Sequence, residues 1–405
     1  MTNEMKNVPA LRFPEFDGDW EEKKLKDISN KGMYGIGASA TEFDGENVYV
    51  RITDINESSR KINNDKLTSP DRLDKKYLLN ENDVLFARTG ASTGKTYIHK
   101  HYDRDKNYYF AGFLIKFEFK NNYLANFIFQ NTLTKRFENW VSVMSVRSGQ
   151  PGINSEEYGK LKMRFPSKVE QNKIGDFFSK LDRQIELEEQ KLEKLEEQKK
   201  GYMQKIFSQE LRFKDENGND YPTWKKTTIK EVAKLTVGKS KKNENTGKYI
   251  IMDMGTVTKN GTMLTHKSTP HENDLLNKGD LVMPKDDIGG GHIIGKTVFI
   301  PESQKYVLGD HVYRLETKKC NGLFLHFYIN SDIVNRSLKR KVTGSAQLGL
   351  NRKSVEEELV KVPCLEEQEK IGAFFSKLDT FIEKQLSKIE LLKERKKGFL
   401  QKMFV

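Results

Sequence analysis

The sequence has little of what marks several large classes of protein. Cysteine occurs only twice in 405 residues, at Cys320 and Cys364, which excludes a disulfide framework and a cysteine-rich zinc module. No apolar run approaches the roughly 18–20 residues that span a bilayer, and the longest, such as residues 323–329, are the size of a strand. Residues 1–13 lack the apolar segment of a signal peptide. We therefore expect a cytoplasmic protein with no membrane partner.

What the sequence has in excess is positive charge and aromatic side chains. Lysine and arginine number 70 against 58 aspartates and glutamates, a net charge of +12 that indicates a polyanionic partner. The chain also holds 24 phenylalanines and 15 tyrosines, too many for a disordered polymer. At roughly 100–200 residues per domain, the length predicts two to four folded domains.

The strongest signal is an internal duplication. Residues 169–207 and 366–404 are identical at 23 of 39 positions, at a constant offset of 197 residues. Weaker matches extend upstream, where residues 148–154 recur as residues 345–351. The chain is therefore two copies of one plan, a globular segment followed by a tail. The tails are closely similar, and the globular segments diverge.

Apolar residues recur in each tail at alternating steps of four and three, which predicts a coiled-coil helix. Each stripe is broken twice, at equivalent polar positions: Glu188 and Lys199 in the first tail, Gln385 and Lys396 in the second. The predicted seam of the helix pair consists of Ile174, Phe178, Leu181, Ile185, Leu192, Leu195, Tyr202, Ile206, Ile371, Phe375, Leu378, Ile382, Ile389, Leu392, Phe399 and Met403.

Two such stripes in one chain are most economically buried against each other. About 37 residues give a rod of roughly 55 Å, and an antiparallel coiled coil places one globular segment at each end with pseudo-two-fold symmetry. Parallel packing and pairing between molecules are the alternatives. The tails are nearly neutral, net 0 for residues 168–207 and +2 for residues 366–404, so the remaining +10 lies on the globular segments. The rod is then a spacer, and the globular segments bind the anion.

The globular segments combine short strands with helices, which predicts an α+β fold with two tandem mixed α/β domains. Strand-like runs such as residues 108–119 alternate with longer helix-like stretches such as residues 323–341. Loops rich in Gly, Ser, Thr, Arg and Lys follow the strands and suit contacts to bases and phosphates, although each loop taken singly is as well explained as ordinary surface. The predicted segments are globular domains at 1–166 and 209–363 and spacer helices at 167–208 and 364–405.

Catalytic constellations do not occur in duplicate, as two copies of one plan would require. No histidine recurs in register, and His99 and His101 have no further ligand nearby, so we expect no metal site and no catalytic residue. Residues 290–297 fit the P-loop pattern G-x-x-x-x-G-K-T, but a strand-like run ended by Pro301 follows instead of a helix that would hold phosphate. A basic hairpin loop is the better interpretation. A P-loop nucleotidase is the enzymatic alternative, and a coiled-coil tether without a nucleic-acid role is the structural one.

The repeated motifs carry a family resemblance. The tail pattern E-Q-x-x-I-x-x-F-x-x-x-L-D followed by K-K-G-x-x-Q spans residues 170–204 and again 367–401. The patterns D-V-L-F-A-R-x-G-x-x-x-G-K at 83–95 and S-x-Q-x-G-I-N at 148–154 accompany it. With these motifs the chain resembles a specificity subunit of a type I restriction–modification system. The second half departs at residues 284–289, where P-K-D-D-I-G replaces the R-x-G turn, so no role of the first turn is carried over to it.

The resemblance implies a non-catalytic DNA-recognition subunit. Two target-recognition domains each bind one half of a bipartite, asymmetric site in double-stranded DNA, while the paired helices set the gap and dock two methyltransferase subunits. Those partners bind S-adenosylmethionine, and restriction subunits add translocation and cleavage driven by ATP and Mg, so this chain holds no cofactor. From position in the loops alone, the side chains predicted to contact DNA are Arg88, Thr89, Lys95, Arg147, Ser148, Gln150, Lys285, His292, Lys296, Ser345 and Gln347.

Overall fold

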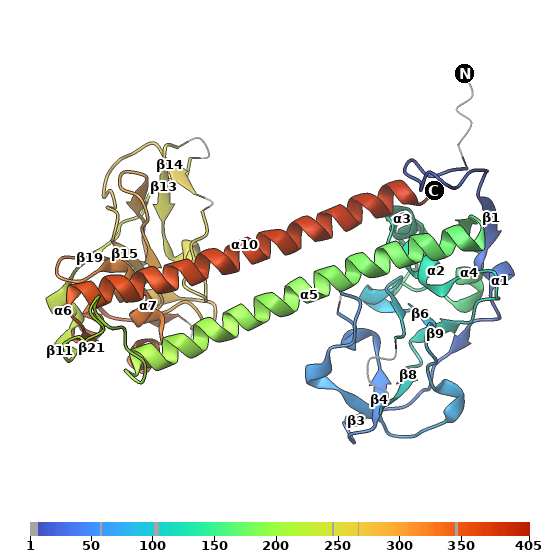
Figure 1. The fold of residues 1–405 in the computed structure, drawn as a ribbon, viewed down its shortest axis with the longest axis horizontal. Coiled ribbons are helices and arrows are strands. Elements are labelled where there is room, and N and C mark those ends of the chain that lie inside the picture. The colour runs from blue at the N-terminus through green and yellow to red at the C-terminus, as the bar shows by residue number, and fades with distance from the viewer. Residues whose placement is uncertain (1–6, 57–58, 101–104, 245–246, 266, 345–346) are drawn as a thin grey trace. The chain divides into compact units, whose positions relative to one another are not determined.

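The computed structural model divides the chain into two compact units. Unit 1 comprises residues 1–190 and 387–405, and unit 2 comprises residues 191–386. Each unit contains one α/β domain and part of each of two long helices, α5 (Lys168–Phe207) and α10 (Leu365–Met403), drawn in green and red in Figure 1. The structure describes residues 7–56, 59–100, 105–244, 247–265, 267–344 and 347–405. None of the helices in these ranges has the length and apolar character needed to span a membrane.

The domain of unit 1 consists of short strands and four short α-helices. Its helices are α1 (Leu25–Ile28), α2 (Ala125–Asn131), α3 (Lys135–Met144) and α4 (Ser155–Gly159). Its strands are β1 (Glu21–Lys24), β2 (Met33–Tyr34), β3 (Ala40–Glu42), β4 (Asn47–Val50), β5 (Thr68–Pro70), β6 (Val84–Ala87), β7 (Thr96–Ile98), β8 (Asn107–Phe110), β9 (Leu114–Phe117) and β10 (Lys162–Phe165).

The domain of unit 2 follows a similar order of elements. Its helices are α6 (Ile229–Val232), α7 (Gly322–Asn330), α8 (Asp332–Lys339) and α9 (Arg352–Glu356). Its strands are β11 (Lys225–Thr228), β12 (Ala233–Val237), β13 (Tyr249–Met252), β14 (Ser268–Thr269), β15 (Leu281–Pro284), β16 (Asp286–Asp287), β17 (Val298–Phe299), β18 (Tyr306–Leu308), β19 (Val312–Thr317), β20 (Leu348–Gly349) and β21 (Leu359–Val362).

A four-stranded antiparallel sheet forms the centre of each domain. Its order is β2-β9-β6-β7 in unit 1 and β12-β19-β15-β17 in unit 2. The apolar runs of β6 and β15 are buried at every residue, as expected for strands covered on both faces. Each domain also contains a parallel pair of strands, β4–β8 in unit 1 and β13–β18 in unit 2. The shared topology confirms the predicted duplicated α+β plan.

The strand run and the helix-like stretch named as examples in the sequence are each split in the structure. The run predicted as one strand over 108–119 forms β8 and β9, because β8 pairs with β4 and β9 pairs with β6 in another sheet, so the chain turns between them. The stretch predicted as one helix over 323–341 forms α7 and α8. Ser331 has an extended backbone conformation there, with ψ 156°, which ends the first helix and begins the second.

The repeated Glu-Gln dipeptide attaches each domain to its long helix. Glu170 accepts two hydrogen bonds from the Arg12 guanidinium, at 2.8 and 2.7 Å. Glu367 accepts two from Arg212, at 3.1 and 2.7 Å. Both carboxylates are fully buried, and a bidentate guanidinium is the partner that best offsets their loss of water. Part of the tail motif therefore serves the fold of the chain itself.

The glutamine of the same dipeptide ties the helix to the short helices of its domain. The Gln171 side chain accepts a hydrogen bond from the Leu124 N–H at 3.0 Å, just before α2. The Gln368 side chain accepts one from the Asn321 N–H at 2.8 Å, just before α7. Equivalent residues thus make equivalent contacts in the two units.

The two long helices run antiparallel within unit 1. The rings of Phe177 and Phe399 lie 5.1 Å apart, and the Lys396 Nζ lies 2.6 Å from the Asp182 Oδ1. A later residue of α5 therefore meets an earlier residue of α10. Lys396, which interrupts the apolar stripe, therefore forms an ion pair with the opposite helix.

Unit 2 repeats this arrangement with the equivalent residues exchanged. The rings of Tyr202 and Phe374 lie 5.3 Å apart, and the Lys199 Nζ lies 2.5 Å from the Asp379 Oδ1. The helices are again antiparallel, as predicted, which removes the parallel alternative. Tyr202 is the one predicted seam residue that is exposed, whereas the buried seam residues are Ile174, Phe178, Ile185, Ile206, Ile371, Phe375, Ile389, Leu392 and Met403.

Candidate nucleic-acid interface

Two loops that were predicted separately lie side by side in unit 1. The first follows β6, and the second precedes α4. The Gly90 N–H donates to the Pro151 carbonyl oxygen at 2.9 Å, and the Ile153 N–H donates to the Arg88 carbonyl oxygen at 2.9 Å. Loop residues separated by about 60 positions in sequence therefore form one surface.

The equivalent loops of unit 2 are joined in the same way. Strands β16 and β20 pair antiparallel, so Asp286 faces Gly349. The Leu350 N–H donates to the Lys285 carbonyl oxygen at 2.8 Å, as Ile153 does to Arg88 in unit 1. Lys285 therefore occupies the position of Arg88, although the surrounding motif differs.

Arg88 presents a guanidinium that has no anionic partner among the residues that the structure describes. Its Cζ lies 5.0 Å from the centroid of the Tyr34 ring, a cation–π contact that fixes the side chain. Its Nε is buried and donates no hydrogen bond to any residue that the structure describes. A desolvated, unsatisfied donor is costly unless a ligand supplies an acceptor. This arrangement suits a pair of acceptors on a base edge or a phosphate.

Lys285 is instead neutralised by its neighbour. Its Nζ lies 2.7 Å from the Asp286 Oδ2, and the same oxygen lies 2.7 Å from the His311 Nδ1. Partial burial disfavours the Asp286 carboxylate, but the hydrogen bonds from Lys285 and His311 outweigh it and hold the pKa of Asp286 below its usual value. Unit 2 therefore presents a carboxylate with two polar neighbours where unit 1 presents the guanidinium of Arg88.

Lys296 makes a structural contact within its own domain. Its Nζ donates to the Asn330 carbonyl oxygen at 3.0 Å, at the end of α7. Burial, together with the charge of nearby Lys339, lowers the pKa of Lys296. The strand β17 follows this loop, so the helix that a P-loop needs at this point is replaced by a strand.

The other predicted contact residues are placed on the loops with different degrees of exposure. Thr89 and Lys95 are half-buried in the loop after β6. Arg147 is exposed, and its guanidinium is paired with Glu157 of α4. Ser345 lies outside the described residues, as does His101. The remaining exposed members are Ser148, Gln150, His292 and Gln347.

Sequence reasoning missed four residues of the two loop surfaces. They are Tyr34 and Phe113 in unit 1 and Asp286 and His311 in unit 2. Tyr34 lies under Arg88, and Phe113 is 62% exposed in the turn between β8 and β9. The signal that the sequence could have offered is a large aromatic residue in a turn between two strands. The turn that contains Phe113 was not recognised because the run 108–119 was predicted as one strand.

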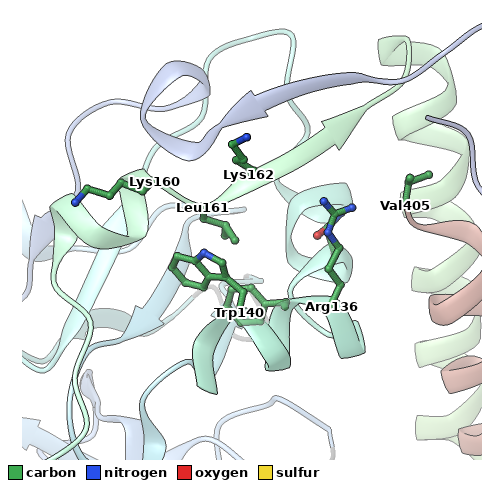
Figure 2. A pocket seen from close by; sticks show the side chains of 8 residues that line it. Arg136, Trp140, Lys160, Leu161, Lys162 and Val405 are labelled. Atoms are coloured by element: carbon green, nitrogen blue, oxygen red, sulfur yellow. The ribbon is translucent and has the colours of Figure 1, made fainter. Parts of the chain in front are cut away.

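A pocket of about 190 Å³ in unit 1 is lined by Arg136, Lys160 and Lys162, of which Lys162 is ion-paired with Glu22 at 2.8 Å. Figure 2 shows Trp140 and Leu161 facing each other, with Arg136 beside them on α3. The equivalent positions of the basic lining residues Arg136, Lys160 and Lys162 are occupied in unit 2 by Ile333, Glu357 and Leu359. The pocket therefore adds a local positive field to unit 1 that these positions do not supply in unit 2.

The long helices expose apolar side chains outside their seam. In unit 1, Leu187 of α5 and Leu391 of α10 are 48% and 50% exposed. In unit 2, Phe381 and Leu386 of α10 are 44% and 41% exposed. These apolar side chains are exposed on helices that are otherwise rich in Glu and Lys. Across the described ranges, no three His, Cys, Asp or Glu side chains are grouped to hold a metal ion.

Comparisons with known proteins agree with this duplicated organisation. The family model described as the type I restriction modification DNA specificity domain matches residues 17–197 and 221–391. The chain is 24% identical to the MjaVIII type I restriction enzyme specificity subunit of Methanocaldococcus jannaschii, over 97% of this chain and 93% of that protein.

Two solved structures share its fold. One is the S subunit of a type I restriction–modification system from M. genitalium, with a TM-score of 0.64 and 15% identity over 98% of this chain and 99% of that chain. The other comes from work on complex assembly and conformational transition of the type I R-M system, with a TM-score of 0.56 and 14% identity over 96% and 98%.

Proposed function

Because the chain belongs to the family of type I restriction modification DNA specificity domains, we propose that its two units read the two halves of one bipartite, asymmetric target in double-stranded DNA. The observation that carries this proposal is the pair of loop surfaces, built on the same backbone hydrogen bonds but bearing different side chains. The common backbone arrangement suits DNA binding by both units, and the different side chains suit recognition of different bases.

The charge distribution supports DNA as the ligand. Most of the net charge of +12 lies outside the nearly neutral tails, on the two domains. Such charge attracts the phosphate backbone regardless of sequence, while the loop side chains supply specificity.

We further propose that two methyltransferase subunits dock on the paired helices and that restriction and translocase subunits join them. The exposed apolar side chains of α5 and α10 support a protein partner there. In this proposal the chain is not catalytic and acts in the cytoplasm. S-adenosylmethionine, ATP and Mg are bound by the partner subunits. The absence of any histidine that recurs between the two copies supports a recognition role over a catalytic one.

The test is an exchange of one domain. Residues 1–166 are replaced by the equivalent segment of another family member, the chain is expressed with its methyltransferase subunits, and methylated DNA is sequenced. We expect one half of the methylated motif to change and the other half to stay. The reciprocal exchange of residues 209–363 should change the other half. An unchanged motif, or a change in both halves from one exchange, contradicts the proposal.

A further inference from the structure

The loop surfaces of the two units can be compared residue by residue, because their backbone bonds fix the equivalence. The Arg88 N–H donates to the Phe113 carbonyl oxygen at 3.0 Å, and the Lys285 N–H donates to the His311 carbonyl oxygen at 3.0 Å. In the sheets, Ala87 faces Leu114 and Pro284 faces Val312. Arg88 and Lys285 thus occupy equivalent positions in the two units, as do Phe113 and His311.

A third equivalence follows from the edge strand of each sheet. Tyr34 faces Ile115 in unit 1, and Val237 faces Tyr313 in unit 2, two residues after the turn position in both cases. The aromatic ring that lies under Arg88 is therefore replaced, at the equivalent strand position, by the aliphatic side chain of Val237. Val237 is 47% exposed, so this position reaches solvent in unit 2.

The side chains at these positions offer opposite chemistry. In unit 1 the Arg88 guanidinium is fixed over Tyr34 and has no anionic partner among the described residues, and the Arg88 N–H donates to the carbonyl oxygen of Phe113, whose ring is exposed. In unit 2 the Asp286 carboxylate binds both the Lys285 ammonium and the His311 imidazole. The first set presents donors beside an apolar face, and the second presents an acceptor held between two polar groups.

We propose that two pairs of side chains each determine one base of a half-site. The pairs are Arg88 with Phe113 in unit 1 and Asp286 with His311 in unit 2. The proposal rests on the proposed function and goes beyond it by naming the residues. Arg88 with Phe113 selects guanine, whose O6 and N7 accept a bidentate guanidinium, with the ring of Phe113 covering the adjacent base. Asp286 with His311 selects a base that presents an exocyclic amino group, as cytosine and adenine do in the major groove.

The test uses the full chain in complex with its methyltransferase subunits. Arg88→Lys keeps the charge but loses the planar fork, and Phe113→Ala removes an exposed ring whose loss leaves the core intact. Each is expected to relax one base position in one half of the methylated motif, with discrimination falling by about 5- to 150-fold. Asp286→Asn with His311→Ala is expected to relax one position in the other half only.

A matched control separates base contact from general charge. Arg136→Ala removes an arginine of the same unit that lies in the pocket of Figure 2, and it is expected to leave base discrimination unchanged. If Arg88→Lys and Phe113→Ala leave the motif unchanged, or weaken binding equally for every base, these side chains do not determine base specificity and the inference is wrong. Failure of the wild-type complex to methylate any defined motif would instead overturn the proposed function.

Discussion

At the scale of the residue, burial gives His326 a property that its sequence context does not show. His326 lies on α7 with its Nδ1 3.1 Å from the Thr297 Oγ1. Desolvation, with smaller contributions from the charges of Lys199 and Lys296, lowers the pKa of His326 from 6.5 to about 3. The folded chain therefore holds this imidazole neutral at a pH where an exposed histidine would be protonated.

This pKa shift predicts a loss of stability in mild acid. The unfolded chain binds a proton at His326 below about pH 6.5 and the folded chain does not, so the free energy of unfolding falls as the pH drops below 6.5. Between pH 7.5 and 5.5 the contribution of His326 is about 1.4 kcal/mol. Urea unfolding of the wild type and of His326→Gln at both values measures it. A wild-type loss equal to that of the variant would contradict the prediction.

At the scale of the element, glycine lets the long helix approach the helix of its domain. A Cβ on Gly372 of α10 would lie 2.9 Å from the Leu323 Cβ and 3.1 Å from the Phe324 backbone nitrogen on α7. The equivalent Gly175 of α5 faces Asn126 of α2 at 3.1 Å. The glycine after the repeated Ile is therefore needed for packing, because any side chain would push two helices apart.

The same helix offers a matched comparison. Gly372→Ala is expected to lower the free energy of unfolding by about 1–3 kcal/mol through overpacking. A Cβ on Gly398, also in α10, would meet no atom within 4 Å. Gly398→Ala is therefore expected to raise stability by roughly 0.5–1 kcal/mol, since alanine restricts the unfolded chain. Chemical denaturation of both variants tests this pair, and similar effects of the two substitutions would contradict it.

At the scale of the whole molecule, α5 and α10 continue from one unit into the other. The boundary between the units falls after Gln190 in α5 and after Leu386 in α10. Inside each unit the helices pair antiparallel through an ion pair of the Lys–Asp type. A change in the length of both helices should therefore change the separation of the two half-sites in the proposed target.

Insertion of one heptad into each helix at these boundaries tests the spacer. Seven residues preserve the 3.5-residue seam and add about 10.5 Å, equivalent to roughly three base pairs. Sequencing of methylated DNA is expected to show the same half-sites with a longer gap. The same heptad inserted after Gly218, in an exposed turn, serves as the control and should leave the gap unchanged. An unchanged gap with the double insertion would remove the spacer role.

The linear chain was sufficient to determine the duplication, the two long helices and their seam. Identity at a fixed offset of 197 residues and a repeat of 3.5 residues are local features that survive without knowledge of the fold. The sequence favoured an antiparallel pair by symmetry but left parallel packing open, and the contacts within each unit decided the direction. The departure at Pro284 in the second copy was visible because the two copies can be compared position by position.

The tertiary structure alone decided which side chains share a surface. Strand pairing places Phe113 beside Arg88 and His311 beside Lys285, and these pairs are 25 and 26 residues apart in sequence. It also directs Lys296, which the loop pattern assigned to DNA contact, onto the end of α7. Loop residues lack a period that could predict their neighbours, so their contacts depend on which strands the sheet brings together.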